Sequence, residues 1–224
     1  MKVLMIAFAV IFTPPAIAQE SRVAPPAIAQ ESRVAPSTMA PKPRIAAPFG
    51  LEWGMRRNAI ASQGVSLTFV SKKKGLAVYM TDSLPKNLSG ADFYGLLFDE
   101  SDRLVKVAYV SETISSDFYG AEGKKWYFRL KEKITRRYGK PESYEWIGLE
   151  LYTDPDEFYQ CLDYHGCGNW ASFWGSKDEG RILLEIFGSG KGRGYVRLEY
   201  ESPLLYEHID KYERQTDVLD SDAL

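Results

Sequence analysis

Short segments in which apolar and polar residues alternate, separated by turns, constrain the fold of this chain more than any other feature. The alternation predicts half-buried β-strands at residues 65–71, 76–80, 93–98, 104–110, 170–174, 182–187 and 195–200. Residues 72–75 and 99–102 separate consecutive strands by no more than a hairpin turn. Strands joined in this way form antiparallel sheets, so the sequence predicts an α+β fold built of hairpins with a few packed helices, and not a doubly wound parallel sheet.

Apolar residues spaced three and four apart indicate helices between these strands. The clearest helix covers residues 121–138 and ends at Gly139. Shorter helices are predicted at 56–63, 155–164 and 204–214, with a further strand at 144–152. The order of elements suggests two related halves, 49–112 and 113–206, although their residues do not match.

The beginning of the chain has the features of a secretory signal peptide. Met1 and Lys2 precede a ten-residue apolar run, and small residues at Ala16 and Ala18 favour cleavage before Gln19. Ten apolar residues are too few to cross a hydrocarbon core of ~30 Å, so no transmembrane anchor is expected in the mature protein. These observations predict that residues 1–18 are removed and that the protein is exported to the periplasm or the extracellular space.

A perfect tandem duplication overlaps the end of the signal segment. Residues 14–24 are repeated without change at 25–35, and the chain up to residue 48 is rich in Pro, Ala and Ser. Such a composition is typical of a disordered linker. The predicted organisation is therefore a linker at 19–48, a single globular domain at 49–206, and a terminal helix with an acidic tail at 207–224.

Overall charge limits the classes of partner. The chain has a net charge of −2 and a pI near 5.8, which argues against a protein built mainly to bind nucleic acid. Basic residues do line the outer side of the long predicted helix, where a solvated surface is the ordinary interpretation. These residues are Lys125, Arg129, Lys133 and Arg136.

The only two cysteines, Cys161 and Cys167, lie close together in the sequence. In an oxidising compartment this spacing favours a local disulfide that closes a short loop. A metal site that adds His165 is the alternative, but zinc sites use four ligands at recognised spacings that this segment lacks. We therefore expect a disulfide, no metal and no cofactor.

Few residues point to catalysis. His165 and His208 are the only histidines, and no nucleophile-elbow motif accompanies them. Residues 188–194 resemble a phosphate-binding loop, but strands are predicted on both sides, which favours a flexible hairpin tip carrying Lys191 and Arg193. Carboxylates at the start of the 155–164 helix and on the late strands leave one alternative open, a hydrolase that uses paired carboxylates on glycans. They are Asp154, Asp156, Glu157, Glu185, Glu199 and Glu201.

Residues 49–60, with Gly54-Met55 at the start of a short helix, resemble the aromatic-Gly-Met opening of small exported bacterial domains. These include the secreted β-lactamase inhibitor proteins and the small lipoprotein of the outer-membrane barrel assembly machine. Arg56 stands where those families usually have Thr or Ser. The resemblance implies a non-enzymatic module whose antiparallel sheet is a protein-contact surface.

The segment after the predicted disulfide is the expected contact surface. Period-2 alternation places Trp170 and Trp174 on one face of a strand and Phe173 on the other. Exposed tryptophans would act as interface anchors, with Tyr164, Lys191 and Arg193 beside them. In the alternative arrangement, both tryptophans are buried under a helix and Phe173 is exposed.

From these features we expect an exported, non-enzymatic binding or inhibitory module of the bacterial cell envelope. Its partner would be an envelope or secreted protein, or a glycan, and not a nucleic acid.

Overall fold

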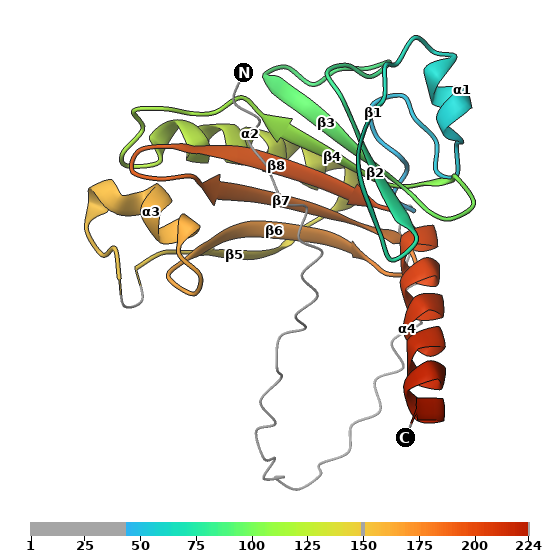
Figure 1. The fold of residues 1–224 in the computed structure, drawn as a ribbon. Coiled ribbons are helices and arrows are strands. Elements are labelled where there is room, and N and C mark those ends of the chain that lie inside the picture. The colour runs from blue at the N-terminus through green and yellow to red at the C-terminus, as the bar shows by residue number, and fades with distance from the viewer. Residues whose placement is uncertain (1–43, 149–150, 224) are drawn as a thin grey trace, which may run out of the picture. The chain divides into compact units, whose positions relative to one another are not determined.

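The computed structural model describes residues 44–148 and 151–223, which belong to one compact unit (Figure 1). The signal segment, the duplication and most of the predicted linker lie outside these residues. The end of that predicted linker lies inside them and is not a linker. Ile45 is only 3% exposed, its amide donates to the carbonyl of Glu179 at 2.9 Å, and its own carbonyl accepts the Trp53 indole N–H at 2.9 Å. The domain therefore begins before Phe49.

In the part of the chain that the structure describes, the predicted α+β fold is confirmed as a single eight-stranded antiparallel sheet with four α-helices. The strand order is β1-β2-β3-β4-β8-β7-β6-β5. The strands are β1 (Thr68–Lys73), β2 (Leu76–Thr81), β3 (Ala91–Phe98), β4 (Leu104–Ser111), β5 (Glu142–Trp146), β6 (Asn169–Ser176), β7 (Gly180–Gly188) and β8 (Gly194–Glu201).

The strand order is symmetrical about the central pair of β4 and β8. On one side β1 to β4 follow each other in space as they do in the sequence, and on the other side β5 to β8 do the same. Each of these meanders follows a helix, α1 (Arg57–Ala61) or α2 (Ala121–Tyr138). The two halves expected from the order of elements thus correspond to two helix-plus-meander units that pair through β4 and β8.

Three helices cover one face of the sheet. Side chains of α1, α2 and α3 (Phe158–Asp163) join inward side chains of the strands in one apolar core. The helical contributors are Ile60, Tyr127, Leu130, Ile134, Phe158 and Tyr159. In Figure 1 the sheet is seen from its other face, with α2 behind the strands.

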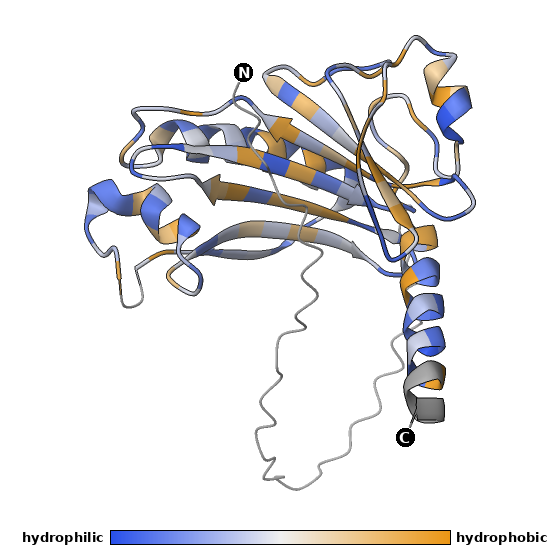
Figure 2. Ribbon diagram, viewed as in Figure 1, coloured by the Kyte–Doolittle hydropathy of each residue, from blue (hydrophilic) through white to orange (hydrophobic). Residues whose placement is uncertain are grey.

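The carboxyl-terminal helix α4 (Pro203–Ala223) differs from the other three. Leu205 and Tyr206 in its first turn are buried, whereas the residues after Tyr212 are exposed as far as their side chains are described. Figure 2 shows that this later part is largely hydrophilic. The helix continues to Ala223, beyond the end at residue 214 that the sequence predicts, so the chain after residue 214 is helical as well.

One other predicted boundary is wrong. The strand predicted at 144–152 is β5, which starts and ends earlier, because Gly148 turns the chain with a φ of 79°. The helix predicted at 155–164 begins as a 3-10 turn, η1 (Pro155–Glu157), and continues as α3, so its bounds are confirmed to within one residue. Within the described part of the chain, no helix has the length and apolar character needed to cross a membrane.

Candidate functional site

Along β7 and β8, most side chains on the second face of the sheet are only half-buried. Residues of β7 alternate strictly between buried and half-buried from Gly180 to Phe187, and β8 does nearly the same. The buried set faces the three helices, and the half-buried set faces away from them. Cross-strand pairing places exposed residues of β5 next to the half-buried residues of β6, β7 and β8 on this side. We call this surface the uncovered face, and it includes Tyr144, Phe173, Arg181, Leu183, Glu185, Phe187, Tyr195 and Arg197.

An ion-pair cluster lies at the centre of the sheet on the uncovered face. Lys106 of β4 places its Nζ 2.7 Å from an oxygen of Glu199 and 3.0 Å from an oxygen of Glu201. Arg197 contacts the other oxygen of Glu199 through Nε at 3.2 Å and reaches Glu185 through Nη2 at 3.3 Å. Five charged side chains from three adjacent strands therefore form one connected network.

Burial and neighbouring charges shift the pKa values of two carboxylates in this cluster in opposite directions. Desolvation, opposed by Arg197, raises the pKa of Glu185 to about 7. Desolvation acts against the charged form of Glu199 as well, but Lys106 and Arg197 outweigh it, and the pKa of Glu199 is lowered. Glu199 is thus held ionised at neutral pH, while Glu185 is poised to take up a proton.

Aromatic rings flank the cluster on the same face. Phe187 and Tyr195 are stacked with their ring centroids 5.2 Å apart, and the Arg197 guanidinium lies 4.1 Å from the centroid of Phe187. On the neighbouring strands Phe173 meets Tyr144 edge to face at 6.0 Å. Aromatic and arginine side chains held in fixed orientations are the residue types that dominate binding energy at protein interfaces.

The contact residues expected from the sequence lie in two different places in the structure, and the two tryptophans lie apart from the others. Trp174 is 3% exposed and donates its indole N–H to the Gly139 carbonyl at 3.0 Å, which argues against a direct contact with a partner. Trp170 is half-buried and packs edge to face on Phe158. The tryptophans thus lie on the helix-covered side and Phe173 lies on the other side, as in the alternative arrangement. Only Trp174 is buried, however, whereas Trp170 and Phe173 are both half-buried.

The remaining expected contact residues lie at one end of the sheet. Tyr164 is 51% exposed at the end of α3. Lys191 and Arg193 are exposed in the turn between β7 and β8, and Lys191 forms an ion pair with Asp156 at 2.8 Å. Since β7 and β8 also carry Phe187 and Tyr195, this turn adjoins the uncovered face, whereas Trp170 and Trp174 do not belong to it.

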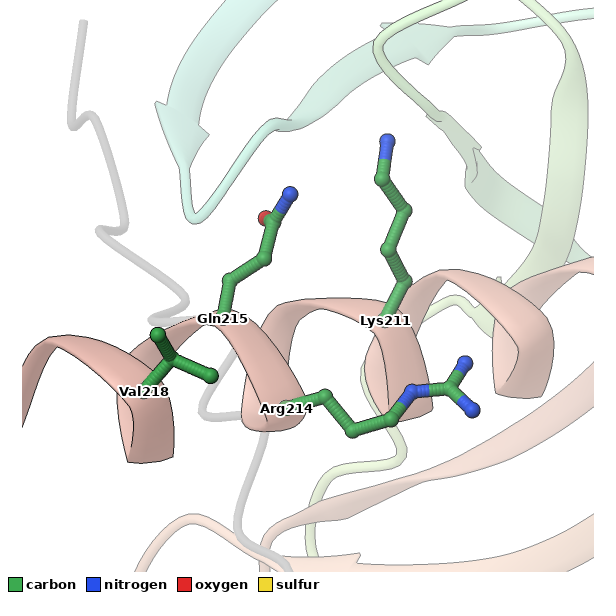
Figure 3. A pocket seen from close by; sticks show the side chains of 4 residues that line it. All are labelled: Lys211, Arg214, Gln215 and Val218. Atoms are coloured by element: carbon green, nitrogen blue, oxygen red, sulfur yellow. The ribbon is translucent and has the colours of Figure 1, made fainter. Parts of the chain in front are cut away.

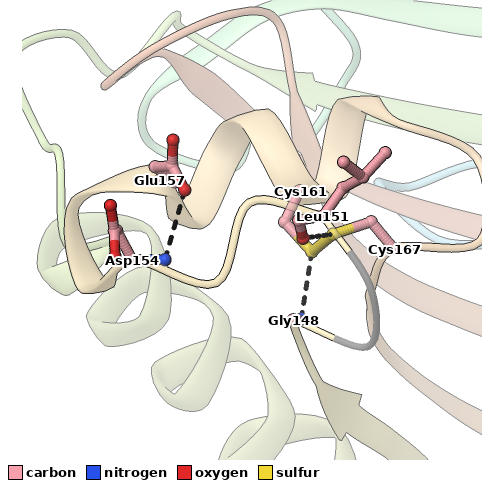
Figure 4. Close-up of a disulfide and its surroundings, with 6 residues drawn as sticks. All are labelled: Gly148, Leu151, Asp154, Glu157, Cys161 and Cys167. Carbon is pink, nitrogen blue, oxygen red and sulfur yellow. Dashed lines mark hydrogen bonds between the residues drawn. A yellow bond between two sulfur atoms is a disulfide. The ribbon is translucent and has the colours of Figure 1, made fainter.

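The predicted disulfide between Cys161 and Cys167 is confirmed, with the two Cα atoms 5.1 Å apart. It joins α3 to the loop before β6, and Cys161 Sγ accepts the amide N–H of Gly148 at 3.2 Å (Figure 4). In the same view Asp154 and Glu157 form a capping box that stabilises the start of η1.

Reduction of the disulfide should lower the free energy of unfolding by about 2 kcal/mol, because the loop that it closes is short. The measurement is urea unfolding followed by circular dichroism, with and without dithiothreitol. A Cys161→Ser/Cys167→Ser variant is the matched control, since its stability should equal that of the reduced wild type and should not respond to the reductant. A wild type that is equally stable in both conditions would show that the bond does not stabilise the fold.

Two surface pockets lie away from the ion-pair cluster. One is lined along the exposed side of α4 by Lys211, Arg214, Gln215 and Val218 (Figure 3). The other lies where the turn between β3 and β4 meets α4, and His208 is among its lining residues. The described residues contain no group of three or more His, Cys, Asp or Glu side chains that could hold a metal ion.

Comparisons with protein-family models, with curated proteins and with solved structures found no match to this chain.

Proposed function

We propose that this chain is an exported, non-enzymatic binding or inhibitory module that uses the uncovered face to contact a protein of the cell envelope. The observation that carries the proposal is the composition of that face. It combines a stacked aromatic pair, an arginine packed on it and a second aromatic pair, all on adjacent strands of one rigid sheet. Side chains already fixed by such contacts lose little conformational freedom when a partner binds, which favours affinity.

The resemblance of residues 49–60 to exported Gly-Met domains supports the same proposal, because it implies a sheet that acts as a contact surface. Gly54 has a φ of 80° and donates its amide to the Leu104 carbonyl at 2.9 Å, which ties the segment before α1 to β4. Arg56 makes no capping hydrogen bond through its side chain, so the usual Thr or Ser cap has no counterpart at this position.

The second candidate function is glycan hydrolysis by a carboxylate pair on the same face. The specific observation in its favour is that Glu185 and Glu199 have pKa values shifted in opposite directions, as an acid and a charged carboxylate need. Against it, Arg197 contacts both carboxylates and Lys106 contacts Glu199. The binding function is therefore the better supported of the two.

Capture from an envelope extract with the immobilised domain distinguishes these functions. The wild type and a Tyr164→Ala variant should retain the same protein, and Phe187→Ala should lose it, because only Phe187 belongs to the uncovered face. Retention by Phe187→Ala, together with cleavage of a cell-wall glycan that Glu185→Gln abolishes, would overturn the proposal and favour the hydrolase.

A further inference from the structure

The exposed side of α2 carries an unusual row of positive charge. Lys125, Arg129, Lys133 and Arg137 follow one another at intervals of four residues, so they lie along a single line of the helix. All four are exposed, in contrast to Tyr127, Leu130 and Ile134, which face the core. Residues 121–140 hold eight Lys and Arg against two Glu, in a chain whose net charge is −2.

The row is not paired with carboxylates within residues 44–148 and 151–223. None of its four cations forms an ion pair there, whereas Lys131 and Arg136 of the same helix are paired with Glu145 and Glu132. Arg129 instead lies over the ring of Trp126 and Arg137 over that of Tyr138, at 4.7 and 5.2 Å from their centroids. We call Lys125, Arg129, Lys133 and Arg137 the cationic row.

The cationic row works against the stability of the helix. Like charges four residues apart on a helix repel one another, and the row contains three such pairs in succession. Packing of the opposite side of α2 on the sheet holds the helix in place despite this repulsion. An exposed row of positive charge without paired carboxylates creates a local field that attracts an anionic ligand.

The shape of the surface selects the kind of anion. From Lys125 to Arg137 the row extends about 18 Å along the outer side of a helix, which suits a broad flat ligand. Single strands of nucleic acid are usually held in a groove, and the row does not lie in one of the pockets described above. The aromatic side chains of Phe118, Tyr119 and Phe128, 42–63% exposed, lie before and beside the row and suit the interfacial region of a bilayer.

We propose that the cationic row of α2 docks the domain on the surface of an anionic phospholipid bilayer. The apolar side of α2 is committed to the core, so the attraction is electrostatic and the helix does not insert. Because α2 covers the face of the sheet opposite the uncovered face, docking would leave Phe187 and the ion-pair cluster directed away from the lipid. This proposal does not depend on the identity of any protein partner.

The test is sedimentation of the domain with vesicles of phosphatidylcholine alone or with about one-third phosphatidylglycerol. We expect binding to the anionic vesicles only, and a steep loss of binding as salt is raised. Each cation near such a surface contributes about fivefold to partitioning, so Lys125→Gln/Arg129→Gln/Lys133→Gln should bind about a hundredfold more weakly. Its melting temperature should be equal to or higher than that of the wild type, because charge repulsion is removed.

The matched control is Lys72→Gln/Lys73→Gln/Lys86→Gln, which removes three exposed cations elsewhere and changes the net charge equally. It should keep most of the binding. Equal losses in the two triple variants, or equal binding to neutral vesicles, would overturn the proposal. Release of the domain from anionic vesicles by stoichiometric duplex DNA would also overturn the proposal, because it would assign the cationic row to nucleic acid. Release by millimolar inorganic phosphate would overturn it too, because the row would then be a site for free anions.

Discussion

Replacement of Asp117 by alanine should lower the free energy of unfolding by about 3 kcal/mol or more. Asp117 is 8% exposed, and its carboxylate accepts the amide N–H groups of Ala121, Glu122 and Gly123 at 2.8, 3.0 and 3.1 Å. It also accepts the Tyr159 hydroxyl at 2.9 Å. Alanine would leave the first amides of α2 and a buried hydroxyl without partners, and each such loss costs about 1–3 kcal/mol.

Two variants separate the contributions of this carboxylate. Asp117→Asn keeps one carbonyl oxygen as acceptor and should lose less stability than Asp117→Ala. Tyr159→Phe removes only the hydroxyl and should cost about 1 kcal/mol. Urea unfolding followed by circular dichroism measures all three. If Asp117→Ala were as stable as the wild type, the start of α2 would not depend on this carboxylate.

Replacement of Lys106 by methionine should destabilise the domain by about 3–5 kcal/mol at neutral pH, because it leaves charged carboxylates in the centre of the sheet without their main partner. Glu199 is nearly inaccessible and keeps only Arg197, while Glu201 keeps the Tyr206 hydroxyl. The matched control is Lys72→Met, which removes an exposed lysine of β1 and should change stability by less than about 0.5 kcal/mol.

The loss of stability caused by Lys106→Met should depend on pH in a defined direction. The pKa of Glu199 is lowered in the folded protein from 4.5, so its ion pairs stabilise the fold above that pH and cease to do so as the pH falls. The difference in unfolding free energy between wild type and Lys106→Met should therefore be greatest near pH 7 and shrink below pH 4.5. A difference that does not change between pH 7 and about pH 3 would show that lost packing, and not charge, is the cause.

The elements of this fold with strong local signals were predictable from the sequence. The bounds of α2 follow from four apolar residues on one helix face and from Gly139, where the chain leaves the helix with a φ of 84°. The hairpins follow from alternation and turn residues. The sequence predictions were wrong where the structure depends on tertiary contacts or lacks a local pattern. Ile45 has the sequence context of a linker, but hydrogen bonds with Glu179 and Trp53 make it part of the domain. The exposed polar end of α4 has no apolar periodicity that would predict a helix.

The candidate site was predictable only in part. Glu185, Glu199 and Glu201 were recognisable as carboxylates on late strands, but Lys106 is 93 or more residues away from its partners Glu199 and Glu201 and joins them only because β4 pairs with β8. No sequence pattern specified that pairing. Alternation did place Phe173 on the opposite face of the strand from the tryptophans, but it did not indicate which face the helices cover. Along β7 and β8, half-buried apolar and charged residues alternate with buried ones. This alternation is the signal that could have indicated the uncovered face.

The central claim, that the uncovered face binds a protein partner, is tested most directly by titrating the captured protein against the wild-type domain and three variants in a calorimeter. Phe187→Ala should weaken binding at least about 30-fold, as expected for an interface anchor worth 2 kcal/mol, and Phe173→Ala should weaken it on the same face. Tyr164→Ala, at the end of α3, should leave the affinity within about twofold of the wild type. Wild-type affinity in folded Phe187→Ala and Phe173→Ala, with loss in Tyr164→Ala, would contradict the claim and place the contact at the end of α3.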